Sequence, residues 1–218
     1  FDMTAACTGA TEKALRKAGV PHEKVYLHPY SHATYYPGAR MMHLKLLFTQ
    51  EGRILGAQIV GHDGVDKRID VLATAMQAGL TVYDLQELEL AYAPPYGSAK
   101  DPVNFAGFVA SNLLRGETQV VHADALPVDS LLLDVREPAE HEAGALPGSR
   151  LMPLGKIRGR LSELPRDRDI VVYCAVGIRG YIAERILRQR GFRAWNLSGG
   201  YTTWKQFNPG EEAVQVTG

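Results

Sequence analysis

Cysteine is scarce in this chain of 218 residues, and Cys7 and Cys174 lie far apart. Two such cysteines build no disulfide framework, which favours a reducing, cytoplasmic setting with a thiol free to react. The chain also lacks net charge, because 24 basic residues balance 24 acidic ones, so nothing points to a nucleic-acid partner. No apolar run is long enough to cross a bilayer, and we expect no membrane association.

The signature of a dinucleotide-binding turn is missing as well. No Gly-x-Gly-x-x-Gly segment lies between a strand and a helix with an acidic residue about twenty positions on. We therefore expect this chain alone to bind no flavin or nicotinamide dinucleotide in that way, and we single out no metal site. The sequence opens at Phe1 with the pattern of a domain interior, so we expect a fragment of a longer protein.

Residues 1–115 are predicted to form an α+β unit, with an antiparallel sheet and helices. The pattern changes from strand alternation to helical spacing near residue 65, and capping signals mark the later helices. The expected elements are a helix at 11–18, extended chain at 24–36, strands at 42–46 and 53–61, and helices at 65–80, from 81 and at 102–114.

Residues 116–123 are polar and unpatterned, and we expect a linker there. Residues 124–210 are predicted to form an α/β domain, because short apolar strands alternating with helices indicate a parallel sheet with helices on both faces. The expected strands lie at 131–135, 150–152, 170–173 and 194–197, and the expected helices lie from 137, at 154–163, at 180–189 and at 201–207.

The most informative functional pattern starts at Cys174, which follows a buried strand and opens a turn before a helix. Arg179 closes this turn. Its other members are Ala175, Val176, Gly177 and Ile178. Backbone N–H groups of such a turn and the positive end of the helix stabilise an anion. We predict a reactive thiolate at Cys174 with Arg179 as a positive charge at the rim, the alternative being a buried, inert cysteine.

Four motifs, in order, resemble a rhodanese domain: Leu133 to Glu137, Gly144 to Ser149, Tyr173 to Arg179, and Leu197 to Gly200 with Trp204. The resemblance implies that Cys174 takes a sulfane sulfur from a small-molecule donor as a persulfide and passes it to a thiol or cyanide. The amides of residues 175–179 would stabilise the terminal sulfur. Ala145 departs from the family, which commonly has His there, at a position that is structural in most members.

The loop length argues against a related chemistry. Phosphatases of similar design place five residues between cysteine and arginine, whereas four residues separate Cys174 from Arg179. A phosphoryl group needs the larger cradle, so the loop favours sulfur transfer. Asp134 is expected to end a strand and pair with a basic side chain, and a supporting role for Asp134 and Arg136 behind the site is the alternative. Gly199 and Gly200 are expected to form a tight turn below the loop.

Segments 31–39, 64–70 and 92–104 resemble the C-terminal dimerisation domain of the coenzyme A-disulfide reductase branch of the flavin-dependent pyridine nucleotide–disulfide oxidoreductases. Rhodanese-fused members of that branch share this domain order. The resemblance implies a homodimer through residues 1–115. It also implies that FAD, NAD(P)H and coenzyme A act in the parent protein and that this chain alone binds no cofactor.

By motif position, Tyr35 and Tyr92 would lie near the partner subunit's flavin and reactive cysteine, where a phenol can donate a hydrogen bond to sulfur. Lys100 would contact coenzyme A phosphates or cap its own loop, two equal options. For Lys67 and Arg68, ion pairs with neighbouring acidic residues 66 or 70 are at least as well supported as ligand binding.

His32 is expected to be structural rather than functional, and Cys7 to be buried and inert. The leading hypothesis is the C-terminal portion of a coenzyme A-disulfide, persulfide or polysulfide reductase, in which the rhodanese chemistry is self-contained. Two alternatives stay open: a free-standing sulfurtransferase, and a non-catalytic dimerisation module with a sulfur-carrier domain.

Overall fold

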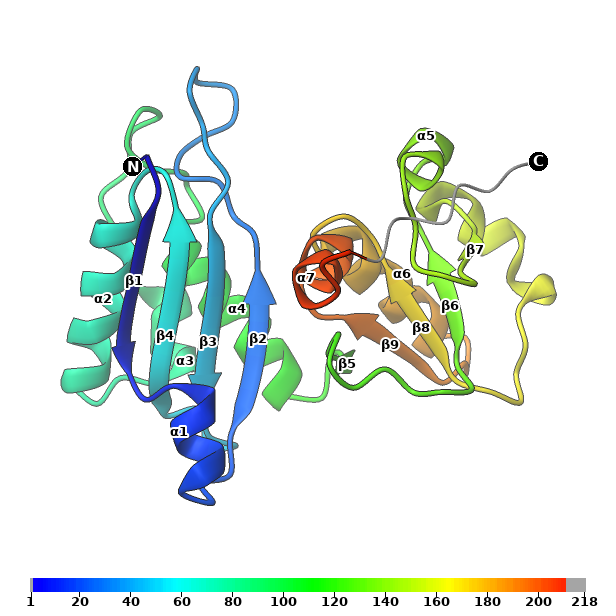
Figure 1. Cartoon of the computed structure of the whole chain (residues 1–218), viewed down its shortest axis with the longest axis horizontal. Coiled ribbons are helices and arrows are strands. Elements are labelled where there is room, and N and C mark those ends of the chain that lie inside the picture. Colours follow the sequence, from blue (N-terminus) through cyan, green and yellow to red (C-terminus); the bar gives the residue numbers. More distant parts are fainter. Residues whose placement is uncertain (1, 211–218) are drawn as a thin grey trace. The chain divides into compact units, whose positions relative to one another are not determined.

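The computed structural model describes residues 2–210, and the chain divides between Arg115 and Gly116 into two compact units (Figure 1). The first unit has an antiparallel sheet with helices, and the second has a parallel sheet with helices on both faces. The predicted fold class is therefore confirmed for both halves of the chain. Within residues 2–210, no helix combines the length and apolar character needed to span a bilayer.

The sheet of the first unit has the strand order β1-β4-β3-β2. Its strands are β1 (Thr4–Gly9), β2 (Glu23–Leu27), β3 (His43–Phe48) and β4 (Ile54–Gly61). Its helices are α1 (Glu12–Lys17), α2 (Val65–Gln77), α3 (Val82–Glu87) and α4 (Pro102–Leu114). Capping fixes two helix starts: Thr81 and Asp84 form the predicted capping box, and Asp101 accepts the Val103 N–H at 3.0 Å.

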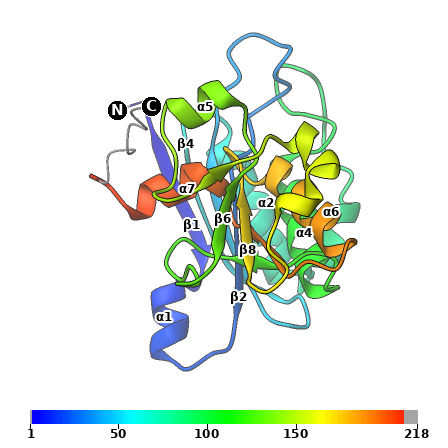
Figure 2. The ribbon, with the colours of Figure 1, turned by 90° about the vertical axis from the view of Figure 1, so that its right-hand side faces the viewer.

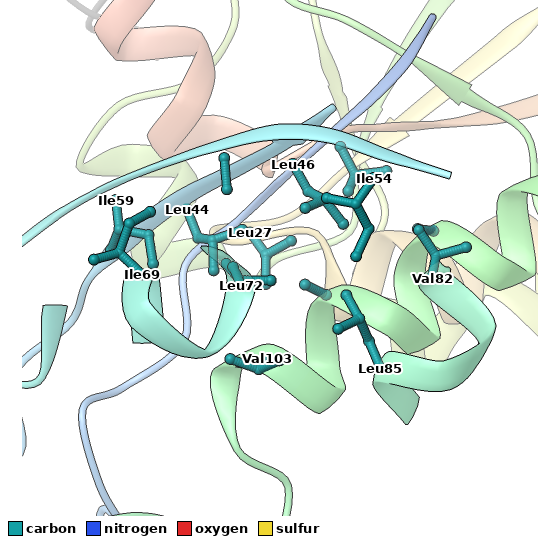
Figure 3. Close-up of a cluster of buried hydrophobic side chains, with 14 of the residues drawn as sticks. Leu27, Leu44, Leu46, Ile54, Ile59, Ile69, Leu72, Val82, Leu85 and Val103 are labelled. Carbon is teal, nitrogen blue, oxygen red and sulfur yellow. The ribbon is translucent and has the colours of Figure 1, made fainter. Parts of the chain in front are cut away.

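The core of the first unit lies between the sheet and helices α2, α3 and α4 (Figure 3). Alternate strand residues such as Leu44 and Leu46 meet Leu72 of α2, and all three are fully buried. Burying each of these side chains contributes about 1.5–3 kcal/mol, so this layer rather than helix propensity holds the unit together.

One prediction for the first unit is wrong in extent. The extended stretch predicted over 24–36 is a strand only as far as Leu27, and the chain beyond it is a loop with an isolated bridge between Tyr30 and Met41. Pro29 has no N–H to give to a strand ladder, which accounts for the end of β2. The loop that follows carries Tyr35.

The sheet of the second unit has the parallel order β5-β9-β8-β6-β7. Its strands are β5 (Val120–Val121), β6 (Leu131–Asp134), β7 (Arg150–Leu151), β8 (Ile170–Tyr173) and β9 (Ala194–Leu197). Its helices are α5 (Pro138–Glu142), α6 (Ile178–Arg188) and α7 (Gly200–Phe207), with short 3₁₀ helices η1 (Leu154–Gly159) and η2 (Leu161–Glu163). Helices α6 and α7 lie on opposite sides of β6 and β8 (Figure 2).

The segment predicted as a linker, 116–123, belongs largely to the second unit. Val120–Val121 is strand β5 and pairs with β9. Just before it, the Thr118 hydroxyl and the Gln119 N–H donate to the buried carboxylate of Glu184, at 3.0 and 2.9 Å. The polar residues of this segment are therefore explained by their hydrogen bonds to the Glu184 carboxylate rather than by a flexible linker.

Candidate active site

Cys174 lies at the carboxyl end of the central strand β8. All four residues of β8 are buried, with β6 and β9 paired on its two sides. Ligands of parallel sheets collect at this end of the strands, and the Cys174 side chain is 1 % exposed there. The strand thus places the buried Cys174 sulfur next to the start of α6.

The turn from Cys174 to α6 wraps around this sulfur. The Gly177 N–H donates a hydrogen bond to the Cys174 Sγ at 3.2 Å. Gly177 has φ of +102°, a left-handed conformation that favours glycine, and α6 begins at the next residue. The Asn196 amide of β9 donates to the Gly177 carbonyl at 3.1 Å and fixes the turn from beneath. An N–H donor and a helix start therefore both face the sulfur.

A second turn supports the first, as predicted for the glycine pair after β9. The Tyr201 N–H donates to the Cys174 carbonyl at 2.8 Å, and the Thr202 N–H donates to the Ala175 carbonyl at 3.0 Å. Gly200 makes this contact possible, because a Cβ there would lie 2.3 Å from the Cys174 carbonyl oxygen. The start of α7 thus holds the backbone of the cysteine loop.

Arg179 lies in the first turn of α6 and forms a bidentate pair with Glu140 of α5. The Arg179 Nη1 and Nη2 donate to the two Glu140 carboxylate oxygens at 2.6 Å each. The hydrogen bond to Glu140 is the main cause that raises the pKa of Arg179, and the nearby Cys174 adds to the rise. The same bond is the main cause that lowers the pKa of Glu140 to about 2. The rim cation predicted from sequence is therefore partnered by a carboxylate.

Sequence reasoning missed Glu140. It lies 39 positions from Arg179, so no local pattern connects the two residues. A signal was present in the spacing of Glu137 and Glu140 around Pro138, which forms the capping box of α5. The capping box predicts the helix start, but only the fold brings this helix beside the cysteine loop.

Asp134 and Arg136 form a buried network beside the cysteine strand. Asp134 ends β6 and accepts hydrogen bonds from the Arg136 guanidinium, from the His141 ring and from the Tyr173 hydroxyl. Burial alone would raise the pKa of Asp134, but the hydrogen bonds from Arg136 and His141 outweigh it and lower the pKa. Arg136 also donates to the Gly144 carbonyl at 2.7 Å. The pair therefore joins the β6 turn to the loop before β7.

The remaining residues of the loop are uncharged, and three of them are at least partly exposed. Ala175 and Val176 are partly exposed, and the side chain of Ile178 is 50 % exposed. The loop therefore offers an apolar surface beside the shielded sulfur, with the Arg179–Glu140 pair as the charged element of the rim.

In the first unit, the structure brings Tyr35 and Tyr92 together from two loops. Their hydroxyl oxygens lie 2.7 Å apart, and the side chains are 74 % and 48 % exposed. Their hydrogen bond raises the pKa of Tyr35. Lys100 is also exposed, and its Nζ lies 5.9 Å from the centre of the Phe108 ring.

Arg68 holds the bases of these two loops. Its side chain is 1 % exposed, and its Nη2 donates to the Ser31 carbonyl at 2.8 Å and to Asp101 at 2.9 Å. A further contact reaches the Tyr96 carbonyl at 3.5 Å. The partner of Arg68 is thus Asp101 rather than the neighbouring acidic residues expected from sequence. Through these contacts Arg68 connects the chain just before Tyr35, at Ser31, with the chain just after Tyr92, at Tyr96 and Asp101.

The expected burial of Cys7 is wrong. Cys7 is exposed on β1, which lies at an edge of the first sheet. Its backbone pairs with Gln58 of β4. The small residues around it suggested a core strand, but Cys7 lies in the row of Gln58 and Lys45, on the sheet face away from the helices, whereas its neighbour Ala6 packs against the core. Both Cys7 and Cys174 are free thiols.

The chain matches two domain families. Residues 1–101 match the pyridine nucleotide-disulphide oxidoreductase dimerisation domain, and residues 119–207 match the rhodanese-like domain. Both resemblances expected from the sequence motifs are thereby confirmed.

Similar proteins with solved structures contain both domains. Reduced CoADR-RHD of Bacillus anthracis is 45 % identical with a TM-score of 0.95, over 98 % of this chain and 39 % of that one. The NAD-dependent persulfide reductase of A. fulgidus is 41 % identical with a TM-score of 0.86, over 94 % and 38 %. Among relatives matched by sequence, the coenzyme A disulfide reductase of Staphylococcus haemolyticus is 45 % identical over 114 residues, which are 52 % of this chain and 26 % of that protein.

The chain thus spans less than half the length of each of these relatives. Residues 1–101 belong to the dimerisation-domain family of the pyridine nucleotide-disulphide oxidoreductases and residues 119–207 to the rhodanese-like family, in the order of the C-terminal portion of coenzyme A disulfide reductase–rhodanese fusions.

Proposed function

We propose that the second unit transfers sulfane sulfur through a persulfide on Cys174. The observation that carries this proposal is the buried Cys174 sulfur, which accepts the Gly177 N–H where α6 begins. An N–H donor and the positive end of a helix favour a sulfur that carries negative charge. The other N–H groups of the loop would stabilise the terminal sulfur of a persulfide for the same electrostatic reason.

The reaction runs in two balanced steps. The Cys174 thiolate attacks the outer sulfur of a donor, the bond to that sulfur breaks, and the leaving group takes the electron pair. Cys174 then carries a persulfide with negative charge on its terminal sulfur, close to the loop amides. A thiolate or cyanide attacks that terminal sulfur and restores the Cys174 thiolate. Arg179 serves as an anion-binding group at the rim, and Asp134 and Arg136 support the loop from beside β8.

The domain assignment is part of the proposal. We assign residues 1–115 to dimerisation and residues 124–210 to sulfur transfer. Of the linker predicted at 116–123, we keep only the residues before Thr118, because the Thr118 hydroxyl already donates a hydrogen bond to Glu184. Two free cysteines suit a reducing compartment such as the cytoplasm.

In a larger protein, the two units would act within a homodimeric coenzyme A-disulfide, persulfide or polysulfide reductase. This proposal rests on the likeness to CoADR-RHD and to the NAD-dependent persulfide reductase. The paired phenols of Tyr35 and Tyr92 would face the partner subunit's active site and donate hydrogen bonds to sulfur. Exposed Lys100 would bind coenzyme A phosphate. Size measurement of the purified chain should give a dimer, and a monomer at micromolar concentration would contradict dimerisation through residues 1–115.

The turns after β6 and β8 in the parallel sheet do not suit FAD or NAD(P)H. A dinucleotide pyrophosphate needs glycines that let the backbone approach it at such a turn. The turn after β6 carries Arg136 and Glu137 instead, and the turn after β8 encloses the Cys174 sulfur. These cofactors therefore belong to the parent protein in our proposal, and transfer through Cys174 requires neither.

A steady-state assay of thiocyanate formation from thiosulfate or polysulfide and cyanide tests the function of the chain. Gly200→Ala is expected to lower this rate by about a hundredfold, because its Cβ would push the Cys174 carbonyl out of place. Gly148→Ala is the matched control, because Gly148 has a positive φ but open space around its Cβ position. Equal rates in the two variants would show that the second turn does not position Cys174.

A further inference from the structure

The cation beside Cys174 is shared with a carboxylate. Arg179 gives both of its terminal nitrogens to Glu140, and the two side chains are about one third exposed at the rim. Bidentate pairs of this kind are among the stronger charge-assisted hydrogen bonds. Arg179 therefore presents to an incoming donor much less positive charge than an unpaired arginine would.

The loop residues themselves and buried Arg136 add no free charge to this pair. Residues 175–178 carry no charge, and Arg136 is buried with its guanidinium on Asp134. Arg136 adds to the effects that lower the pKa of Glu140, so it favours the charged carboxylate. Arg179 and Glu140 are thus the charged pair that directly adjoins the uncharged loop residues.

Glu140 is held in place by its own helix. Its Oε2 accepts the Glu137 N–H at 3.0 Å in the capping box of α5. With its pKa lowered to about 2, mainly by Arg179, the carboxylate stays charged throughout the neutral range. It is therefore a fixed negative charge at the rim of the cradle.

We propose that Glu140 is a specificity-determining residue that disfavours dianionic sulfur donors and leaves the site to donors with one negative charge or none. The proposal rests on sulfur transfer by Cys174. The apolar loop residues beside the sulfur suit a donor with an organic group. We expect thiosulfate, which has two negative charges and no apolar group, to bind most weakly at such a rim.

Two donors of different charge test the proposal, namely thiosulfate with two negative charges and benzenethiosulfonate with one. The phenyl group of benzenethiosulfonate is the same in every variant, so its effect cancels when the change caused by a substitution is compared between the donors. Each gives its outer sulfur to Cys174 in the same step, and sulfite or benzenesulfinate leaves with the electron pair. Cyanide then takes the sulfur as thiocyanate. The interaction of a donor with a fixed charge scales with donor charge, so removing that charge favours the dianion twice as strongly in free energy.

Glu140→Gln removes the charge but keeps an oxygen that can cap α5 and accept one hydrogen bond from Arg179. We expect kcat/KM to rise about tenfold for thiosulfate and about threefold for benzenethiosulfonate, mostly through KM. Added salt should reduce both gains by screening. Glu142→Gln, an exposed residue of the same helix, is the control and should leave the ratio between donors unchanged.

If Glu140→Gln lowered the activity with both donors by the same factor, or left the ratio of their kcat/KM values unchanged, the proposed role of Glu140 would be wrong. A second measurement needs no variant: with Arg179 paired, the thiosulfate KM of the unaltered chain should rise less than about twofold across the physiological salt range. A steep rise would show an unpaired cation and contradict the proposal. If the unaltered chain transfers sulfur from neither donor, the proposed function itself fails.

Discussion

Replacing Cys174 by Ser is expected to abolish sulfur transfer to cyanide, with a loss of about a thousandfold or more. Serine is close in size, so the Gly177 N–H keeps an acceptor and the loop keeps its geometry. Its hydroxyl is a much weaker nucleophile at neutral pH and cannot hold a persulfide. Steady-state thiocyanate formation measures the loss, and circular dichroism checks that the fold is intact.

Cys7→Ser is the matched control for this experiment. Cys7 is the other free thiol, and it is exposed on β1 of the first unit. We expect Cys7→Ser to retain the full transfer rate. A Cys174→Ser variant as active as the unaltered chain would contradict the assignment of the nucleophile, as would a loss of activity confined to Cys7→Ser.

Arg68→Met is expected to destabilise the first unit by about 3–5 kcal/mol, because it leaves the Asp101 carboxylate buried without its main partner. It also removes hydrogen bonds to the Ser31 and Tyr96 carbonyls, which hold the loops of Tyr35 and Tyr92. With a urea m-value of about 1–3 kcal/mol/M, the unfolding midpoint of this unit should fall by about 2 M.

The chain supplies an internal control for this experiment. Its tryptophans, Trp195 and Trp204, both lie in the second unit, so tryptophan fluorescence reports on that unit alone. Arg68→Met should shift the transition seen by circular dichroism and leave the tryptophan transition in place. Lys67→Met removes a partly exposed amine 3.9 Å from Asp101 and should cost less than about 1 kcal/mol. Equal effects of Lys67→Met and Arg68→Met would contradict the importance of the buried pair.

The parts of the site predicted well from sequence are those encoded locally. An apolar strand, a turn with Gly177 and a helix start lie within a few residues of one another, so their pattern predicts where Cys174 lies. The same holds for Gly200, whose conformation and position after β9 follow from neighbouring residues. Asp134 was expected to pair with a basic side chain, and the partner that the structure shows, Arg136, lies only two positions away.

The parts that escaped prediction depend on residues distant in the chain. Glu140 meets Arg179, and Arg68 meets Asp101, only after the units have folded, and the acidic neighbours of Arg68 offered closer but wrong partners. The exposure of Cys7 depends on which face of the sheet the helices cover. That is a property of the whole unit, and the composition of β1 does not contain it.

The most direct test of a persulfide on Cys174 is the mass of the chain after exposure to thiosulfate or polysulfide without an acceptor. We predict one added sulfur atom on the peptide that contains Cys174, in the unaltered chain and in Cys7→Ser, and we expect cyanide to remove it as thiocyanate. Cys174→Ser should gain no such sulfur. Sulfur found only on Cys7, or no sulfur that cyanide can remove, would contradict a persulfide in the Cys174 cradle.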